Sequence, residues 1–533
     1  MAILLQSNYI FDTESKTTFA GFLLIEGNRI VDRGTIDQIP QNLPVGTQHI
    51  HVQNQMIIPG LIDAHVHFYL SALLHQGALT HVTGLTEEAI AAQVPAIPIK
   101  HGWKIGIGWF SSDFGQQVYP TRASIDRYCK DVPVMLIAGD AHSIWLNSSA
   151  IKALGITPET LPVGISGEAL MENNRLTGCF LEAIAIHYLA EVLHVFQPES
   201  PAAFLDYMKQ LNQYGITTIG DVALTGESWD DLVYPALYKK TAASATVRAV
   251  FYPAMREDTA LLQEYYQHYR SEKVQMGGVK QFFDGVTSTH TAFLKESYET
   301  PYFPGDVGMP LIDVAQMRRL ILSANQRDWP MRIHTIGDKA IQQALLFYQE
   351  SAACQPLSSG KYNTLEHLEV MDATDLPLVA QQQLVLSVQP SHLLVGWETL
   401  EEEVGEIRAQ QMFPFRSFIQ QGATLAFGTD TPVVIDVTPL DSIYFAVSRS
   451  EKSGQPHGGL MPTEKMAVAE ALYAHTAGAA KALSRQDIGG LEVGQLADIC
   501  ILSENILPLS PEALLKVKVA ATIFDGQFVY QAE

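Results

Sequence analysis

The stretch Met56-Ile57-Ile58-Pro59-Gly60-Leu61-Ile62-Asp63-Ala64-His65-Val66-His67 is an apolar run that ends in two alternate histidines. A short apolar run of this kind is typical of a buried strand, and alternate residues of a strand share one face. The side chains of His65 and His67 are therefore expected to point into the same space. Two neutral imidazoles there suit zinc or a neighbouring divalent ion, although a hydrogen-bonded structural pair explains His-x-His alone equally well.

Three further polar residues each close a short strand-like run. His334 ends the segment 329–334, His367 follows Leu365-Glu366, and Asp430 follows the segment 425–429. In a parallel barrel, residues at the carboxyl ends of the strands face one shared mouth. We therefore predict that four histidines and Asp430 converge.

Length and net charge limit the classes of protein to which this chain can belong. A chain of 533 residues can form one large barrel together with a smaller domain. The net charge of -23 argues against nucleic acid and anionic membranes as partners. The first eight residues lack a positive segment, and no later stretch reaches the roughly 18 apolar residues that span a bilayer. A cytoplasmic enzyme with a small-molecule substrate is the expectation, and the sequence does not define its oligomeric state.

The pattern of elements predicts three parts. Residues 1–58 and 485–533 read as short strands, with Asp525-Gly526 as a hairpin turn in the second segment. We expect the two ends to form one small β-sandwich. From about residue 200 onward, helical stretches such as 202–214 alternate with short apolar runs such as 215–221, the rhythm of βα units, and we assign residues 59–484 to the barrel. The predicted fold is α/β, a TIM-like (β/α)8 barrel that carries a cap insert at about 78–200.

The ordered set Pro59-Gly60 to His65-x-His67, His334 with Gly337-Asp338, His367 and Asp430 resembles the amidohydrolase superfamily of metal-dependent barrel hydrolases. The match to the branch that contains N-substituted formamide deformylase, the amidohydrolase family 3 type, is closer. It rests on the following segments: Asp140-x-His142 with Asn147-Ser148, Gly178 to Glu182, Val279-Lys280 with Asp284-Gly285, Gln389 to His392, Gly428 to Pro432, and Gly489 to Ile499. Two positions depart from the family: Ala141 stands where glycine is usual, and Ile137-Ala138 lacks a usual arginine.

The resemblance implies a set of metal ligands. His65 and His67 would hold one divalent ion, His334 and His367 a second, and Asp430 would bind metal and accept a proton. Zinc is the expected metal, with one or two ions bound. Metal coordination lowers the pKa of water from about 15.7 to about 7, and a carboxylate beside that water can move its proton to a leaving amine.

The resemblance also suggests a bridging ligand. Lys280 lies where related enzymes carry a carboxylated lysine that joins two metals, and a salt bridge to Asp284 or another carboxylate is the alternative. Glu182 competes for the bridging role because a carboxylate needs no modification. A helix-capping or cap-domain ion pair explains Glu182 equally well.

Five further residues are candidate substrate contacts: Asp140, His142, His290, His392 and Trp109. An Asp-x-His pair can instead pin a loop through backbone hydrogen bonds, and either later histidine can fill a supporting polar position. Phe110 and Phe114 are expected beside Trp109 in the pocket wall, although such aromatic residues more often serve packing.

The expected function is hydrolysis of a carbon–nitrogen bond other than a peptide bond, in an amide or an N-substituted formamide. The enzyme alternative is hydrolysis of a lactone, another ester or a cyclic amide, because fold does not settle chemistry. A metal-stabilised binding or regulatory protein without turnover is the alternative from another class.

Overall fold

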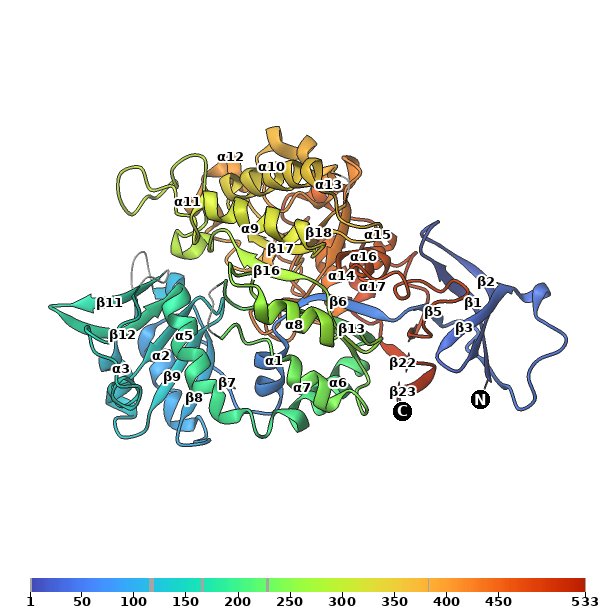
Figure 1. The fold of residues 1–533 in the computed structure, drawn as a ribbon, viewed down its shortest axis with the longest axis horizontal. Helices are drawn as coiled ribbons and strands as arrows, with labels where there is room; N and C mark the ends of the chain where they lie inside the picture. The colour runs from blue at the N-terminus through green and yellow to red at the C-terminus, as the bar shows by residue number, and fades with distance from the viewer. Residues whose placement is uncertain (1, 115–118, 164–166, 227–229, 382, 533) are drawn as a thin grey trace.

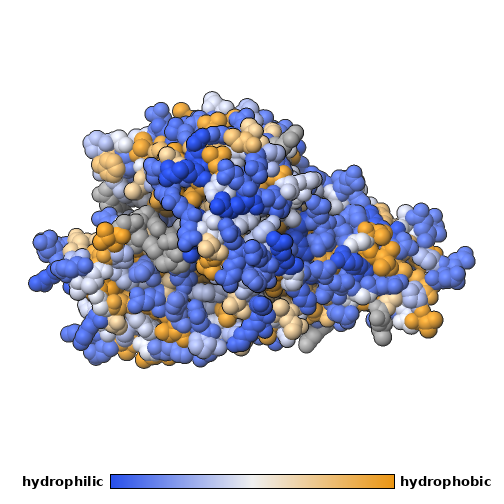
Figure 2. All heavy atoms as spheres, viewed as in Figure 1, coloured by the Kyte–Doolittle hydropathy of each residue, from blue (hydrophilic) through white to orange (hydrophobic). Residues whose placement is uncertain are grey.

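The computed structural model describes residues 2–114, 119–163, 167–226, 230–381 and 383–532. In Figure 1, a sheet from the N-terminal residues lies at one end of the molecule and a sheet from the cap interval at the other, with helices and parallel strands between them. Figure 2 shows a mainly hydrophilic face on which hydrophobic residues gather only in small groups. No helix in the described part of the chain is long and apolar enough to cross a membrane.

The two ends of the chain form one eight-stranded sheet in the order β23-β22-β21-β5-β1-β2-β3, with β4 paired to β1. Its strands are β1 (Ala2–Asp12), β2 (Thr17–Glu26), β3 (Arg29–Thr35), β4 (Gln48–His51), β5 (Met56–Pro59), β21 (Ile499–Leu502), β22 (Val519–Phe524) and β23 (Gln527–Gln531). The predicted hairpin is confirmed: β22 and β23 pair antiparallel, and Asp525 and Gly526 both have positive φ in the turn. Strand β5 joins the N-terminal and C-terminal strands of this sheet, because it pairs with β1 and with β21.

The cap interval contains a second sheet of six strands in the order β11-β12-β10-β9-β8-β7. Its strands are β7 (Thr80–His81), β8 (Lys104–Trp109), β9 (Val134–Ala138), β10 (Ser143–Leu146), β11 (Glu168–Glu172) and β12 (Arg175–Leu181). The helices of this region are α2 (Glu87–Ala91), α3 (Arg122–Tyr128), α4 (Ser148–Ala153) and α5 (Glu182–Leu193). A separate hydrophobic cluster around Trp109 and Trp145 fills its interior.

Two parallel sheets occupy the centre of the molecule, in the orders β15-β14-β13-β6 and β16-β17-β18-β19-β20. The strands are β6 (Leu61–Val66), β13 (Ile216–Val222), β14 (Arg248–Tyr252), β15 (Val274–Met276), β16 (Val279–Phe282), β17 (Met331–Thr335), β18 (Asn363–His367), β19 (Leu384–Val388) and β20 (Thr424–Phe427). Every residue of β6, β13, β14, β16, β17, β18 and β19 is buried. Parallel strands covered on both faces require such continuous burial.

Backbone hydrogen bonds join the edges of these two sheets. At one seam the N–H of Lys280 donates to Pro253 (2.9 Å) and the N–H of Met255 donates to Lys280 (2.7 Å). At the other seam the N–H of Asp430 donates to His65 (2.9 Å) and the N–H of His67 to Thr431 (2.9 Å). The carboxyl ends of β6 and β20 are therefore held side by side.

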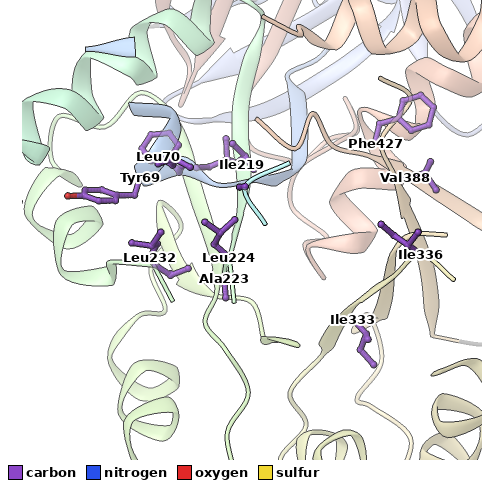
Figure 3. Close-up of a cluster of buried hydrophobic side chains, with 14 of the residues drawn as sticks. Tyr69, Leu70, Ile219, Ala223, Leu224, Leu232, Ile333, Ile336, Val388 and Phe427 are labelled. Carbon is purple, nitrogen blue, oxygen red and sulfur yellow. The ribbon is translucent and has the colours of Figure 1, made fainter. Parts of the chain in front are cut away.

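Helices alternate with the central strands. They are α1 (Phe68–His75), α6 (Ser200–Gln213), α7 (Pro235–Thr241), α8 (Ala260–His268), α9 (Val314–Gln326), α10 (Asp338–Cys354), α11 (Leu400–Val404), α12 (Glu406–Ala409), α13 (Phe415–Gln420), α14 (Pro439–Ser448), α15 (Val468–Ala474) and α16 (Ala477–Ala482), with α17 (Pro511–Leu514) before β22. Helix α10 buries Ile341, Ala344, Leu345 and Tyr348, the spacing of one helical face. Figure 3 shows side chains of both central sheets, among them Ile333 of β17, in one buried cluster.

Candidate metal centre

The four predicted histidines and Asp430 lie together at the carboxyl ends of their strands. The ring centroids of His65 and His67 are 5.6 Å apart, those of His65 and His367 5.1 Å, and those of His334 and His367 4.5 Å. His65 is on β6, His334 on β17 and His367 at the end of β18. Convergence follows because parallel strands end at the same edge.

Asp430 is the hub of the cluster. Its Oδ1 lies 3.3 Å from Nε2 of His65 and 3.2 Å from Nε2 of His67. Its Oδ2 lies 3.3 Å from Nε2 of His392 and 4.0 Å from Nδ1 of His367. Burial acts to raise the pKa of Asp430, but the imidazoles, His65 first, outweigh it and hold this pKa well below its usual range. Asp430 is therefore an anion among histidines.

Hydrogen bonds to Nδ1, on the side that faces away from Asp430, fix the rings of His65 and His67. Nδ1 of His65 lies 2.7 Å from Oε2 of Glu366, and Nδ1 of His67 donates to the carbonyl of Val222 (3.0 Å). Oε1 of Glu366 accepts from Nε of Arg332 at 2.6 Å. A carbonyl can only accept, so His67 carries its proton on Nδ1 and turns the Nε2 lone pair towards Asp430.

Several buried polar atoms here lack a hydrogen-bond partner among the described residues. They are Nζ of Lys280, Nδ1 of His367, Nε2 of His392 and Oδ1 of Asp430. Buried polar atoms rarely remain unsatisfied, so such a cluster needs an explanation. Donor atoms of His65, His367 and Asp430 lie within 4.8 Å of one another, as do those of His367, Glu369 and His392. Nitrogen and carboxylate donors are the set that zinc takes, so these residues fit a divalent metal.

Two of the histidines are neutral. Burial, and then the charge of Lys280, lower the pKa of His334 well below its usual range. Burial, and then His334, do the same to His367. Nε2 of His334 faces the carbonyl of Gly285 at 3.3 Å, which leaves Nδ1 with its lone pair. The neutral imidazole is the form that binds metal.

Lys280 lies on β16 with its side chain fully buried. Burial lowers its pKa to about 8. The alternative salt bridge to Asp284 is absent from the described structure. Asp284 instead accepts the backbone N–H groups of Phe293, Ile336 and Gly337. The amine is therefore left for another partner.

Glu182 lies near the cluster around Asp430, and its partners are other residues. Its Oε2 is 2.7 Å from Nδ1 of His142, and its Oε1 accepts from the hydroxyl of Thr291 at 3.0 Å. Both carboxylate oxygens are thus engaged: Oε2 in the cap ion pair that was the alternative to a bridging role, and Oε1 in a hydrogen bond from Thr291. Burial acts to lower the pKa of His142, but Glu182 and then Asp140 outweigh it and raise this pKa to about 9.

The Asp140-x-His142 pair pins its loop and lies at the cavity, while its expected contact with substrate stays a prediction. Oδ1 of Asp140 accepts the backbone N–H of His142 at 2.9 Å, as a loop-pinning pair does. Both residues also line the cavity at the cluster. Ala141 between them has φ 60°, a left-handed conformation that glycine adopts more easily. The departure from the family pattern therefore falls at a strained position.

A cavity of about 240 Å³ opens at the cluster. Its polar lining includes the predicted ligands other than Glu182, together with Asp113, Asp140, His142, Glu369, His392 and Glu403. Its other side is apolar and includes Phe110, Phe282, Val395, Leu400, Phe413 and Val433. Nδ1 of His392 pairs with Oε1 of Glu369 at 3.0 Å. Burial acts to lower the pKa of His392, but Asp430 and Glu369 outweigh it and raise this pKa to about 10.

Two predicted substrate contacts lie outside this cavity's described lining. His290 stacks between Tyr298 and Tyr302, at centroid distances of 3.9 and 3.7 Å. Its Nδ1 pairs with Asp306 at 2.7 Å. Trp109 is fully buried in the cap cluster, where its Nε1 donates to Leu136 at 3.0 Å. The neighbouring Phe110 lines the cavity in its place, because successive strand residues face opposite sides.

Three buried charged residues of the site were not anticipated. Glu366 and Arg332 stand behind His65, and Glu369 stands behind His392. A signal exists for the first two, since each is a charged residue one or two positions before a predicted ligand in a short strand-like segment. Glu369 carries no such signal, because the sequence around it is not strand-like.

The chain is similar to known proteins along most of its length. The model of the amidohydrolase family matches residues 49–530. Protein LONG AFTER FAR-RED 3 of Arabidopsis thaliana is 30% identical over 517 residues, which cover 94% of this chain and 87% of the plant protein. N-substituted formamide deformylase of Arthrobacter pascens is 25% identical over 545 residues, with 97% and 96% of the two chains covered.

Solved structures share the fold at lower identity. An uncharacterized metal-dependent hydrolase from Pyrococcus horikoshii aligns with a TM-score of 0.75 at 20% identity, covering 96% of this chain and 99% of its own. Atrazine chlorohydrolase TrzN from Arthrobacter aurescens, solved with zinc, aligns with a TM-score of 0.55 at 14% identity, covering 99% and 95%.

Proposed function

This chain belongs to the amidohydrolase family, and we propose that it is a metal-dependent hydrolase of carbon–nitrogen bonds other than peptide bonds, acting on an amide or an N-substituted formamide. One observation carries the proposal. Buried, unsatisfied nitrogen and oxygen atoms of Lys280, His367, His392 and Asp430 meet at the floor of one cavity. The name of the formamide deformylase relative supports the class of bond.

We propose that the two central sheets form the eight-stranded barrel of the predicted (β/α)8 fold, from β6, β13, β14 and β16 to β20. The backbone hydrogen bonds at Lys280 and at Asp430 support both closures. In this scheme residues 59–484 are the hydrolase barrel with the cap insert at 78–200. Residues 1–58 and 485–533 make the second domain.

For the metal we propose the ligand scheme that the family implies. His65 and His67 hold one ion, His334 and His367 a second, and Asp430 contacts metal. Zinc is proposed because the donors are imidazole and carboxylate and because a zinc-bound neighbour shares the fold. When bound, such a metal lowers the pKa of water and polarises a carbonyl oxygen.

Lys280 is proposed as the bridging ligand in carboxylated form. Its neutral amine adds to carbon dioxide, forming one nitrogen–carbon bond and releasing one proton. The product carbamate is an anion with two oxygens for two cations. The unpartnered, fully buried Nζ supports this role, and the engagement of both oxygens of Glu182 favours Lys280 over Glu182 as the bridge.

Side chains of the protein carry out the remaining parts of the proposed reaction. Asp430 accepts the proton of the attacking water and delivers it to the leaving nitrogen. His392, positively charged and oriented by Glu369, donates from Nε2 to the substrate carbonyl oxygen. Asp140 and His142 contact the substrate from the cap. The wall that includes Phe110 and Phe413 takes an apolar group and excludes water.

The test is metal content of the unchelated protein by plasma mass spectrometry, together with hydrolysis of an amide and formamide panel before and after chelation. We expect about two zinc ions per chain and turnover that chelation abolishes. His334→Ala and Asp430→Ala should lose metal and turnover, whereas His268→Ala, on the exposed end of α8, should keep both. Hydrolysis of lactones alone would assign the site to ester chemistry. Bound metal without turnover of any substrate would favour a binding protein.

A further inference from the structure

A second and larger cavity, of about 660 Å³, adjoins the proposed reaction cavity. The two share His142, Leu224 and Phe282 in their linings. From there the larger cavity extends to the residues before α8 and to the first turn of α9, which include Arg256, Asp258 and Gln316. The two cavities therefore lie side by side and meet at these three side chains.

The carboxylates that line this larger cavity in the described structure already have partners. Oε2 of Glu182 pairs with His142 (2.7 Å), Glu257 with Arg319 (3.6 Å), Asp258 accepts the N–H of Ala260 (3.0 Å), and Asp313 accepts the N–H of Gln316 (2.9 Å). The last two cap the first turns of α8 and α9, where helix dipoles favour negative charge. Each of the four carboxylates is thus already engaged with a group of the protein.

Arg256 differs from these groups. Its Nη2 lies 3.6 Å from Oδ2 of Asp231, and its Nε is buried without a hydrogen-bond partner in the described part of the chain. Asp231 already accepts the backbone N–H groups of Ala254 (2.8 Å) and Val233 (3.2 Å). The guanidinium is therefore held in the wall by one loose ion pair and keeps most of its donors.

We propose that Arg256 binds a carboxylate on the substrate, so that the substrate class is an amide with an anionic group on a substituent that extends into the larger cavity. This inference rests on the proposed function. A guanidinium presents a planar pair of donors that matches the two oxygens of a carboxylate. The apolar wall of the smaller cavity takes the other substituent.

The test uses pairs of amides that differ only in ending with a carboxylate or with a neutral carboxamide. The end group is placed on the acyl side in one set and on the amine side in another, with spacers of increasing length. In the metal-loaded enzyme we expect kcat/KM to favour the carboxylate by about tenfold or more in at least one set, from a charged hydrogen bond. Arg256→Gln should abolish this preference through KM and leave the carboxamide partner unchanged. Equal preference in wild type and variant would overturn the inference.

Two controls separate this inference from its premise. Arg318→Gln removes an exposed arginine of α9 that pairs with Glu350, both outside the cavity lining, and it should keep the preference. Binding of non-hydrolysable amine analogues of the same pairs is measured by calorimetry. Binding that requires Arg256, without hydrolysis of any amide, would uphold the anion site and refute the hydrolase. Hydrolysis without any carboxylate preference in either set would do the reverse.

Discussion

Glu366 connects two buried side chains, His65 and Arg332, behind the candidate metal centre. One oxygen contacts Nδ1 of His65 and the other accepts from Nε of Arg332. Burial acts to raise the pKa of Glu366, but Arg332 and then His65 outweigh it, so this pKa lies well below its usual range. A carboxylate in this position fixes the ring orientation and the tautomer of a metal-binding histidine.

We predict that Glu366→Gln lowers metal affinity by about 10–100-fold. The amide can still contact His65, but it no longer offers a negative charge to the imidazole. The measurement is competition for zinc against a chromophoric chelator at constant pH. Because Arg332 would lose its buried partner, the double variant Glu366→Gln with Arg332→Met is measured beside it. Unchanged affinity in both variants would contradict the positioning role.

At the scale of elements, α15 is attached to β6 by His475. Its Nδ1 donates to the carbonyl of Ile62 at 3.1 Å, and its ring packs edge-on against Phe427 of β20 at 5.3 Å. The side chain is fully buried, and burial lowers its pKa to about 4. Folding therefore keeps this histidine neutral where the unfolded chain would protonate it.

This burial predicts a pH dependence of stability. His475 contributes stability above its unfolded pKa of about 6.5, and the contribution is lost as the pH falls towards about 4. The loss should reach about 3 kcal/mol across that window. His475→Gln keeps a donor for Ile62 but does not titrate. Chemical denaturation from pH 7 to pH 4 should show a shallower decline for the variant than for the wild type, and equal slopes would exclude His475 as a source.

Sequence patterns predicted single elements well, because the pattern of one helix, strand or turn depends on its own residues. The segment 200–213 is helical and 216–222 is a strand, close to the expected 202–214 and 215–221. Between β18 and β19 the order of βα units is broken, because the 3-10 helix Ala373–Val379 stands in place of an α-helix. Pro377 within it removes a backbone donor and disfavours a regular helix.

At the scale of the whole molecule, Arg248 joins the central sheets to the sheet from the chain ends. From β14 its Nε contacts Asp498 at 2.6 Å and its Nη2 contacts Asp525 at 2.8 Å. Arg248 is fully buried and Asp498 nearly so. These contacts fix the hairpin turn between β22 and β23 against β14, which lies two strands away from β6, the strand that carries His65.

We predict that Arg248→Met destabilises the protein by about 3–5 kcal/mol, because Asp498 would remain buried without its partner. Thermal and denaturant unfolding measure the effect. Arg318→Gln breaks an exposed pair with Glu350 and should change little. If Arg248→Met and Arg318→Gln had equal midpoints, the buried ion pair would not be what attaches the two parts.

Local pattern was enough for the α/β class and for the five polar residues that close the strands, and the family was indicated by a resemblance of motifs along the whole chain. Burial and the alternation of apolar and polar residues repeat within a few residues, so neighbouring positions in the sequence are enough to reveal them. Tertiary structure decided which side chains support the site. Glu366 and His65 are 301 residues apart, Phe110 rather than Trp109 faces the cavity, and Arg256 lines a second cavity built from the cap, α8 and α9. Such partnerships depend on how distant strands and helices pack, and no periodicity within a single segment encodes that packing.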